Sequence, residues 1–165
     1  MDFFSDIYES PVGPLQMISD SRNLCLLKYF RADKVDSLIS SKFSNHRINN
    51  KSNEVLLETS KQLSEYFLGK RKKFEIPLRF IYGTIFQIKV WTSLRTIKYA
   101  ETSSYLDVAK NIDNPRSYRA VGNANNKNPI SIIIPCHRVI SNTGTLGGYG
   151  GGLNEKIFLL NLEQK

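Results

Sequence analysis

The sequence predicts an α/β protein with a small N-terminal α/β domain, residues 1–81, and a mostly helical C-terminal domain, residues 82–165. Short apolar runs separated by turn residues fill the first thirty positions, a pattern typical of β-strands. From Thr84 onward, apolar residues recur instead at helical spacing. The pair Tyr82-Gly83 stands between these two patterns, and we place the domain boundary there.

The composition is that of an ordinary globular protein. Of the 165 residues, 41% are hydrophobic and 23% are charged, which argues against intrinsic disorder. No apolar run approaches the roughly 18 residues that a transmembrane helix needs, and the acidic N-terminus lacks the basic segment of a secretory signal. With Cys25 and Cys136 as its two cysteines, the chain suits a reducing compartment. We therefore expect a cytoplasmic protein, or a nuclear one in a eukaryote.

Net charge gives the first indication of a partner. The 23 basic and 15 acidic side chains leave a formal charge of +8, which suits a polyanion such as nucleic acid. The excess is mild and is spread over both domains, with 13 basic against 10 acidic residues up to position 81 and 10 against 5 after it. Many basic proteins bind no polyanion, so the charge leaves both interpretations open.

The N-terminal domain is predicted to contain three strands and one helix. The strands are expected over Asp2–Glu9, Leu15–Ser19 and Arg22–Phe30. Helical spacing of apolar residues predicts a helix over Glu54–Leu68, which Gly69 ends. The Ser- and Asn-rich segment Ser41–Asn53 is expected to be an exposed loop, and Phe74–Phe80 to be extended.

The C-terminal domain begins with clear helix signals. Thr84 and Gln87 have the spacing of a capping box at the start of a helix, and Ser104 is expected to cap a second, short helix. Asn114-Pro115 predicts the start of the next helix, with Asn as the cap and Pro in the first turn. Two short helices joined by a tight turn outline a helix-turn-helix, although helix pairs of this kind are common in other proteins.

The most informative segment is Asn128–Ile140. Its four closely spaced isoleucines predict a buried strand that Pro135 ends, because proline cannot donate to a sheet. Cys136 should therefore emerge at the end of a rigid element. A loop with six glycines, Ser141–Gly152, follows and allows the backbone to approach a ligand closely. The last helix is expected over Leu153–Glu163, with Leu153, Ile157 and Leu160 on one face.

Cys136 has two interpretations. A free cysteine commonly packs as a small, inert hydrophobic residue. The neighbouring residues favour a nucleophile instead, because His137 can take the thiol proton directly or through a water molecule, and Arg138 adds positive charge. Glu163 on the last helix is a candidate for the carboxylate that orients such a histidine.

The segment Ile-Pro-Cys-His-Arg-Val, residues 134–139, resembles the active-site signature of the O6-alkylguanine-DNA alkyltransferases, a family that repairs alkylated DNA. Other blocks resemble this family in the same order along nearly the whole chain. They are residues 10–13, 62–69, 83–91, 104–105, 119–122, 128–129 and 148–153. The resemblance implies a ribonuclease H-like fold for the N-terminal domain and a winged helix-turn-helix in the C-terminal domain.

The resemblance also implies a reaction. In this family a cysteine thiolate displaces guanine from the alkyl carbon on O6, and the thioether is permanent, so each molecule acts once. By resemblance, Cys136 is the nucleophile, His137 is the base acting through water, and Glu163 orients His137. Tyr105 would donate its phenol proton toward the guanine ring. Asn128 would hold the predicted strand and the Cys turn in place.

Contacts with the base and with DNA follow from the same resemblance. The carbonyls of Cys136 and Val139 and the amide of Gly150 would contact the base edge, and Tyr149 would line the alkyl pocket. The partner would be double-stranded DNA containing O6-alkylguanine, bound from the minor groove with the base flipped out. Arg119 would fill the vacated stack. The residues expected to meet DNA are Arg116, Ser117, Tyr118, Arg119, Lys127 and Arg138. Ser117 and Tyr118 stand where the family usually has small apolar residues.

We expect a monomer without cofactor or metal. Relatives that bind structural zinc use two Cys and two His, whereas the N-terminal domain here has only Cys25 and His46. Two other functions remain open. A non-enzymatic sensor of alkylated DNA would lack the nucleophile that Cys136 supplies, and a Cys-His hydrolase of acyl substrates would turn over many times.

Overall fold

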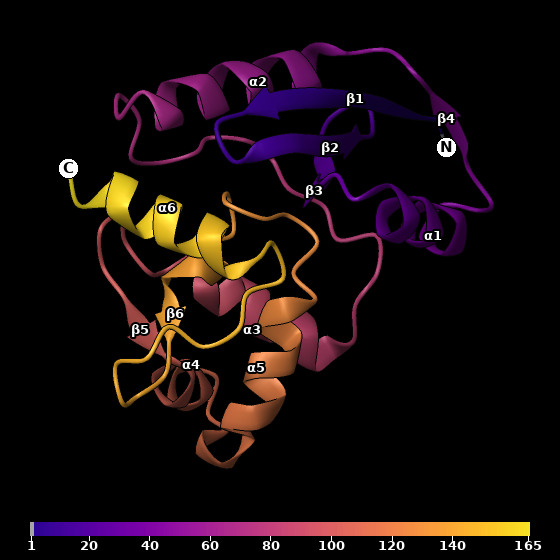
Figure 1. The fold of residues 1–165 in the computed structure, drawn as a ribbon. Coiled ribbons are helices and arrows are strands. Elements are labelled where there is room, and N and C mark those ends of the chain that lie inside the picture. The colour runs from indigo at the N-terminus through magenta and orange to yellow at the C-terminus, as the bar shows by residue number, and fades with distance from the viewer. Residues whose placement is uncertain (1) are drawn as a thin grey trace. The chain divides into compact units, whose positions relative to one another are not determined.

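The chain divides into two units, Met1–Tyr82 and Gly83–Lys165, each with its own packing. The computed structural model describes residues 2–165, apart from the side chains of Ala32 and Asp33. The first unit contains a sheet with helices and the second is mostly helical (Figure 1). This arrangement confirms the predicted fold class.

The first unit is built on a four-stranded sheet of order β3-β2-β1-β4. Its elements are β1 (Asp2–Ser10), β2 (Gly13–Ser19), β3 (Leu24–Tyr29), α1 (Ala32–Lys42), β4 (Arg47–Asn49) and α2 (Glu54–Phe67). Neighbouring strands are antiparallel except that β4 runs parallel to β1. The three predicted strands and the predicted helix are confirmed. The segment 74–80 is extended and makes one bridge to the sheet, between Leu24 and Leu78.

The loop expected over Ser41–Asn53 is wrong in part, because the structure places β4 inside it. The sequence also did not predict α1, which ends at Lys42. α1 has no capping side chain at Arg31, so the sequence carries no start signal for this helix. β4 has three residues and depends on Phe3 and its neighbours in β1 as pairing partners. Such a non-local contact leaves no local pattern.

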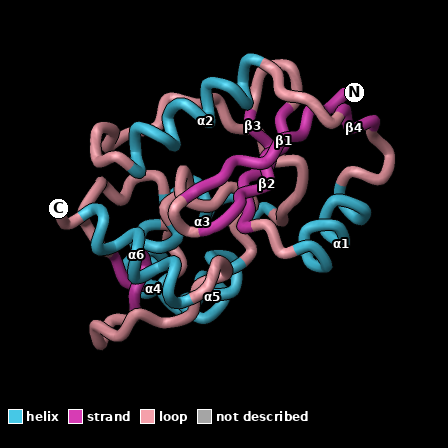
Figure 2. The backbone as a smooth tube through the Cα atoms, turned by 45° about the horizontal axis from the view of Figure 1, so that its top comes forward, coloured by secondary structure: helices cyan, strands magenta, loops and turns pink. Residues whose placement is uncertain are grey.

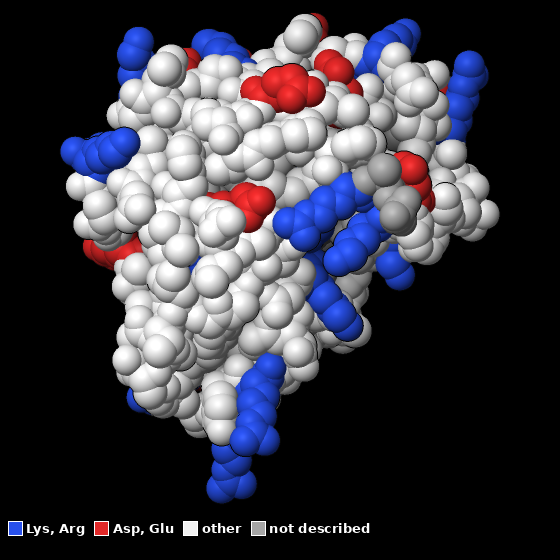
Figure 3. All heavy atoms as spheres, viewed as in Figure 1, with Lys and Arg blue, Asp and Glu red and all other residues white. Residues whose placement is uncertain are grey.

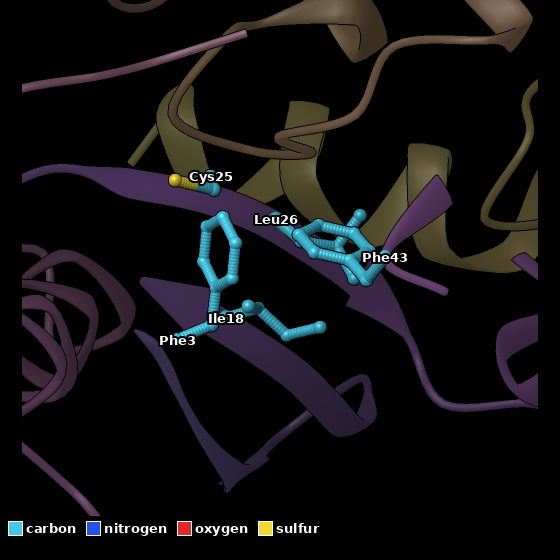
Figure 4. Packing of buried hydrophobic residues seen from close by; sticks show 5 residues of the cluster. All are labelled: Phe3, Ile18, Cys25, Leu26 and Phe43. Atoms are coloured by element: carbon cyan, nitrogen blue, oxygen red, sulfur yellow. The ribbon is translucent and has the colours of Figure 1, made fainter. Parts of the chain in front are cut away.

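A cluster of apolar side chains holds this unit together (Figure 4). It consists of Phe3, Ile18, Cys25, Leu26 and Phe43. The rings of Phe3 and Phe43 meet edge to face with centroids 5.1 Å apart, a favourable aromatic geometry. Burial raises the pKa of the Cys25 thiol to about 12, so Cys25 stays protonated and serves packing.

The second unit contains four α-helices, two 3-10 turns and two short strands in the described chain. They are α3 (Ile85–Leu94), β5 (Ser103–Ser104), α4 (Tyr105–Asn111), η1 (Pro115–Ser117), α5 (Tyr118–Asn126), η2 (Cys136–Arg138), β6 (Val139–Ile140) and α6 (Leu153–Glu163). β5 and β6 pair in parallel. α4, η1 and α5 pack together as the helix-turn-helix that the sequence outlined (Figure 2).

Capping explains where these helices begin. Both bonds of the predicted capping box between Thr84 and Gln87 are present, and the Ser104 side chain accepts from the backbone N–H of Asp107. The expected Asn114 side-chain cap is wrong. Instead, the backbone carbonyl of Asn114 accepts from Ser117, and a 3-10 turn precedes α5.

Trp91 links α3 to α5 at the centre of this unit. The indole is fully buried, and its Nε1 donates to the carbonyl of Ala124, 2.7 Å away. Gly83 packs against the same ring: its φ is +128°, and a Cβ there would lie 2.6 Å from the indole. Only glycine therefore fits at this position without displacing Trp91.

The buried face of α6 differs from the expected one. Leu153 and Ile157 are exposed, whereas Lys156, Leu159 and Glu163 point inward. The polar pair Lys156 and Glu163 turns inward because each finds hydrogen-bond partners there, as described below. Within residues 2–165, no helix is long and apolar enough to cross a membrane.

Candidate active site

The segment before Cys136 is buried, but the predicted strand is wrong. Instead of a strand, Asn128–Ile134 folds into tight turns. The N–H of Ile133 donates to the carbonyl of Ser131, 2.8 Å away, which closes a γ-turn around Ile132 with φ +72°. A β-branched residue in this region is a genuine outlier, with a cost of order 1–3 kcal/mol.

A second tight turn follows at Pro135. The N–H of Cys136 donates to the carbonyl of Ile134 at 2.8 Å, and Pro135 has φ −80° and ψ 61°, the common inverse γ-turn. The chain then enters η2, which begins at Cys136. The cysteine side chain is buried, with 3% of the residue exposed, so packing restricts where its sulfur can lie.

Asn128 ties these turns to the cysteine. Its side-chain Nδ2 lies 3.1 Å from Sγ of Cys136 and 2.9 Å from the carbonyl of Ile134, while its Oδ1 accepts from the N–H of Ile130. Both ends of the turn region are therefore held by one buried amide. An N–H donor directed at sulfur favours the thiolate over the thiol.

His137, Glu163 and Arg138 form a buried charge network. His137 Nε2 lies 2.7 Å from one Glu163 carboxylate oxygen, and Arg138 donates to both oxygens at 2.8 and 3.0 Å. Burial alone would raise the pKa of Glu163, but the bonds from His137 and Arg138 outweigh it and lower that pKa to about 2. Glu163 is therefore ionised.

The ionised carboxylate determines the protonation of His137. Because a carboxylate only accepts hydrogen bonds, Nε2 of His137 must carry the proton that it shares with Glu163. Complete burial lowers the pKa of His137, against the opposing effect of Glu163, so the ring is neutral and Nδ1 holds a lone pair. Among the described residues, Nδ1 is one of two buried side-chain polar atoms without a hydrogen-bond partner. The ring is thus prepared to accept a proton.

The expectation that Arg138 contacts DNA is wrong. Its guanidinium is buried, and besides Glu163 it bonds the carbonyl of Ile97 at 2.7 Å. A side chain held inside the unit in this way cannot reach phosphate. Arg138 instead keeps the Glu163 carboxylate ionised and fixed in position.

Lys156 was not expected to take part in the site. Its ammonium is buried and donates to the carbonyl of Val139 at 2.6 Å and to that of Leu146. Burial lowers the pKa of Lys156 to about 8, while the charge of Cys136 opposes this shift. Lys156 thus places a positive charge close to Cys136 and ties the glycine-rich loop to β6.

Tyr105 and the glycine-rich loop approach each other closely. The Tyr105 hydroxyl lies 3.5 Å from the carbonyl of Gly148, and burial together with the charge of Cys136 raises the pKa of the phenol. A Cβ at Gly147 would lie 3.0 Å from that hydroxyl, and one at Gly150 would lie 3.0 Å from the carbonyl of Asn126. The half-buried Tyr149 lies on the same loop.

The remaining residues expected to contact DNA lie on the surface of the helix-turn-helix. Arg116, Tyr118, Arg119 and Lys127 are exposed and Ser117 is half-buried. The Arg119 guanidinium lies over the Tyr118 ring, 5.8 Å from its centroid, a cation–π distance. Figure 3 shows basic side chains projecting at the bottom of the view, over η1 and the start of α5.

Asn125 is a further residue that sequence reasoning missed. It is buried near the end of α5, and its Nδ2 donates to the backbone carbonyl of Cys136 at 3.2 Å. Its Oδ1 is the second buried polar atom without a partner among the described residues. Only its helical spacing from the buried Val121 could have indicated that this side chain points inward.

Known proteins resemble the chain over nearly its full length. Residues 4–80 match the ribonuclease-like domain of 6-O-methylguanine DNA methyltransferase and residues 85–165 match its DNA binding domain. A methylated-DNA–protein-cysteine methyltransferase of Methanosarcina acetivorans is 45% identical over 95% of this chain and 96% of the relative. The constitutive enzyme of that name from Bacillus subtilis is 41% identical over 94% and 92%, respectively.

Solved structures show the same likeness. A crystal structure of Mycobacterium tuberculosis OGT in complex with DNA superposes with a TM-score of 0.83 at 38% identity, covering 99% of this chain and 93% of that chain. The O6-methylguanine methyltransferase structure from the same organism gives a TM-score of 0.81 at 37% identity, covering 98% and 93%. The ribonuclease-like fold expected for the N-terminal domain is confirmed by its match to that domain.

Proposed function

Because the chain belongs to the 6-O-methylguanine DNA methyltransferase family, we propose that it repairs DNA by direct reversal, moving an alkyl group from guanine O6 to Cys136. One observation in the site gives this proposal its main support. A buried cysteine is followed by a neutral histidine whose Nε2–H is fixed by an ionised glutamate, so a proton acceptor stands beside a nucleophile.

The proposed reaction starts with loss of the thiol proton. Nδ1 of His137 accepts this proton from Cys136, directly or through one water molecule, and the ring becomes a cation stabilised by Glu163. Asn128, which donates to Sγ, and the nearby ammonium of Lys156 stabilise the thiolate. The nucleophile and its base are thus activated by groups already in place.

Alkyl transfer is then an in-line displacement. A lone pair of Sγ forms a bond to the alkyl carbon while the bond from that carbon to O6 breaks, and its electrons pass to the guanine ring. Tyr105 donates its phenol proton to the ring, which improves the leaving group. The products are unmodified guanine and a thioether at Cys136. The thioether is permanent in this proposal, so each molecule acts once.

The proposed substrate is double-stranded DNA with the alkylated base flipped out of the stack. The target carbon is not accessible within a duplex, and Cys136 is itself recessed. In this proposal α5 enters the minor groove, Arg119 fills the vacated stack, and Arg116 and Lys127 meet phosphates, which position the protein without specifying sequence. The protein acts as a monomer without a cofactor.

The test is intact mass spectrometry after exposure to a duplex containing O6-methylguanine. The wild-type chain should gain one methyl group, at Cys136, and no more with excess DNA. Cys136→Ser should gain none yet still bind the duplex, because a hydroxyl is a far weaker nucleophile. Methylation at Cys25 in that variant would overturn the assignment, and many turnovers would indicate a Cys-His hydrolase instead.

A further inference from the structure

The turn between α3 and β5 contacts the buried charge network that η2 and α6 form. The N–H of Ala100 donates to Oε2 of Glu163 at 3.2 Å, and the Ala100 carbonyl accepts from Nε2 of Gln164 at 2.9 Å. The carbonyl of Ile97 accepts from Arg138 at 2.7 Å. This turn therefore bonds both members of the ion pair between Arg138 and Glu163.

The backbone of Ala100 is strained in this turn. Its φ is +65°, in the left-handed region that is unfavourable for a residue with a Cβ. Strained residues of this kind persist where surrounding contacts hold them, and they cluster at functional sites. Here the strained backbone directs an N–H at Glu163 and a carbonyl at Gln164, so the two bonds to the end of α6 hold it.

The turn also determines which oxygen of Glu163 faces the histidine. Oε2 accepts from Nε of Arg138 at 2.8 Å and from the N–H of Ala100, while Oε1 lies 2.7 Å from Nε2 of His137. Because donors on two different elements hold Oε2, the carboxylate cannot rotate without losing one of them. Oε1 is thereby directed at His137, the proposed base.

Tyr99 lies against the other member of the ion pair. Its ring centroid is 5.8 Å from the guanidinium carbon of Arg138, within the range of a cation–π contact. Arg138 is 7% exposed and Tyr99 is half-buried, so the ring covers part of a guanidinium that is otherwise enclosed. The preceding residue, Lys98, is exposed and offers a matched control position.

Building on the proposed function, we propose that Tyr99 is a positioning residue for alkyl transfer, because its ring holds the guanidinium of Arg138 against Glu163. This contact keeps Oε1 of the carboxylate directed at His137. Without the ring, water would reach the guanidinium and the ion pair would loosen. The ring and not the hydroxyl carries this role, since the hydroxyl lies 3.5 Å from the carbonyl of Leu162, longer than a normal O–H···O bond.

The charges around His137 determine how the loss of the ring would act. Glu163 and Lys156 face it from α6, and Arg138 and Cys136 flank it in η2. Burial and the charge of Arg138 both lower the pKa of His137, against the opposing effect of Glu163. Water at a loosened ion pair weakens both lowering effects, so this pKa should rise. Since the base must be neutral to accept a proton, the acid limb of the rate profile should move to higher pH.

The test measures single-turnover methyl transfer from a duplex containing O6-methylguanine, by intact mass, from pH 5 to pH 9. Tyr99→Leu removes the ring. Its acid limb should lie about one pH unit above that of the wild type, which is about a tenfold loss of rate on that limb. Tyr99→Phe keeps the ring and should match the wild type, as should Lys98→Leu at the exposed neighbouring position.

A further variant keeps the test decisive if leucine packs badly. Tyr99→Met fills the same space with a flexible side chain that has no ring, and its acid limb should move in the same direction. Urea unfolding at each pH verifies that the compared proteins are folded. An unchanged acid limb in Tyr99→Met, or equal slowing at every pH, would overturn the inference. A wild-type protein that gains no methyl group from the duplex would instead contradict the proposed function.

Discussion

The carboxylate of Glu163 lies 2.7 Å from Nε2 of His137, on a helix that begins fifteen residues after η2 ends. Arg138 donates to the same carboxylate, so the histidine is placed between fixed charges before any proton moves. When His137 accepts the thiol proton, its new charge lies against an anion that is already neutralised in part by Arg138. Proton transfer therefore requires no rearrangement of buried charge.

Stability in acid should depend on Glu163. Its pKa is about 2 in the folded protein and 4.5 ordinarily, so the stabilisation is complete above pH 4.5 and is lost as the pH falls toward 2. The loss should be about 3 kcal/mol. Glu163→Gln should lower stability at pH 7 by a similar amount and lose this part of the pH dependence. Urea unfolding from pH 7 to 2 measures both, and parallel curves for the two proteins would contradict the prediction.

Asn128 should act on the nucleophile through charge. Asn128→Asp keeps an acceptor for the N–H of Ile130 but loses the donor to Sγ and places a negative charge beside it. Asn128→Ala removes the side-chain bonds to Ile134, Sγ and Ile130 without adding charge. We expect both variants to slow alkyl transfer at least about tenfold, with Asp slower than Ala. If Ala were the slower variant in single-turnover assays, the role of Asn128 would be packing alone.

Gly147 should matter through Tyr105. An alanine there would place Cβ 3.0 Å from the Tyr105 hydroxyl, whereas Gly144 has the same positive sign of φ and nothing within 4 Å. Both alanine variants carry a similar backbone strain, about 1–2 kcal/mol. Gly147→Ala should slow methyl transfer about tenfold, a fraction of a general acid's contribution, and Gly144→Ala should not. Equal rates in the two variants would rule out the contact with Tyr105 as the cause.

Arg119→Ala should impair repair of duplex DNA more than reaction with the free modified base. Arg119 is exposed near the start of α5, where it is proposed to fill the stack that the flipped base leaves. A free base needs no flipping, so its rate should stay within about twofold, while the duplex rate falls tenfold or more. Equal losses on both substrates would indicate a structural role.

Tyr118→Ala should weaken duplex binding modestly, by about 1 kcal/mol, the scale of a neutral hydrogen bond. The side chain is 45% exposed, and its ring lies beneath Arg119, so it should contact the backbone and not the groove floor. Affinity should be measured at two salt concentrations, since phosphate contacts are salt-dependent. Tighter binding by the alanine variant would show that the ring obstructs docking.

Local signals in the sequence predicted the parts of the fold that local interactions form. The capping pair at Thr84 and Gln87 and the bounds of α6, Leu153–Glu163, are confirmed because caps and glycines act within one turn. β4 was missed because its partner strand lies more than forty residues away. The turn at Ile132 was mistaken for a strand because a run of isoleucines indicates burial and not backbone direction.

The residues of the candidate site were also predicted only in part. The contact between His137 and Glu163 was expected, since a cysteine and a histidine side by side call for an orienting carboxylate. Arg138 was assigned to the wrong partner, because charge in a sequence suggests exposure, whereas this guanidinium is buried. Lys156 and Asn125 were missed because each bonds backbone carbonyls, and backbone acceptors leave no trace in side-chain patterns.

The second unit should not tolerate a larger side chain at Gly83, its first residue. The glycine packs on Trp91, whose indole holds the carbonyl of Ala124 in the last turns of α5. A methyl group added at Gly83 would displace the indole, and the displacement would reach the helix proposed to enter DNA. Gly83→Ala should therefore behave as a temperature-sensitive DNA-binding defect, although Gly83 is not among the residues proposed to meet DNA.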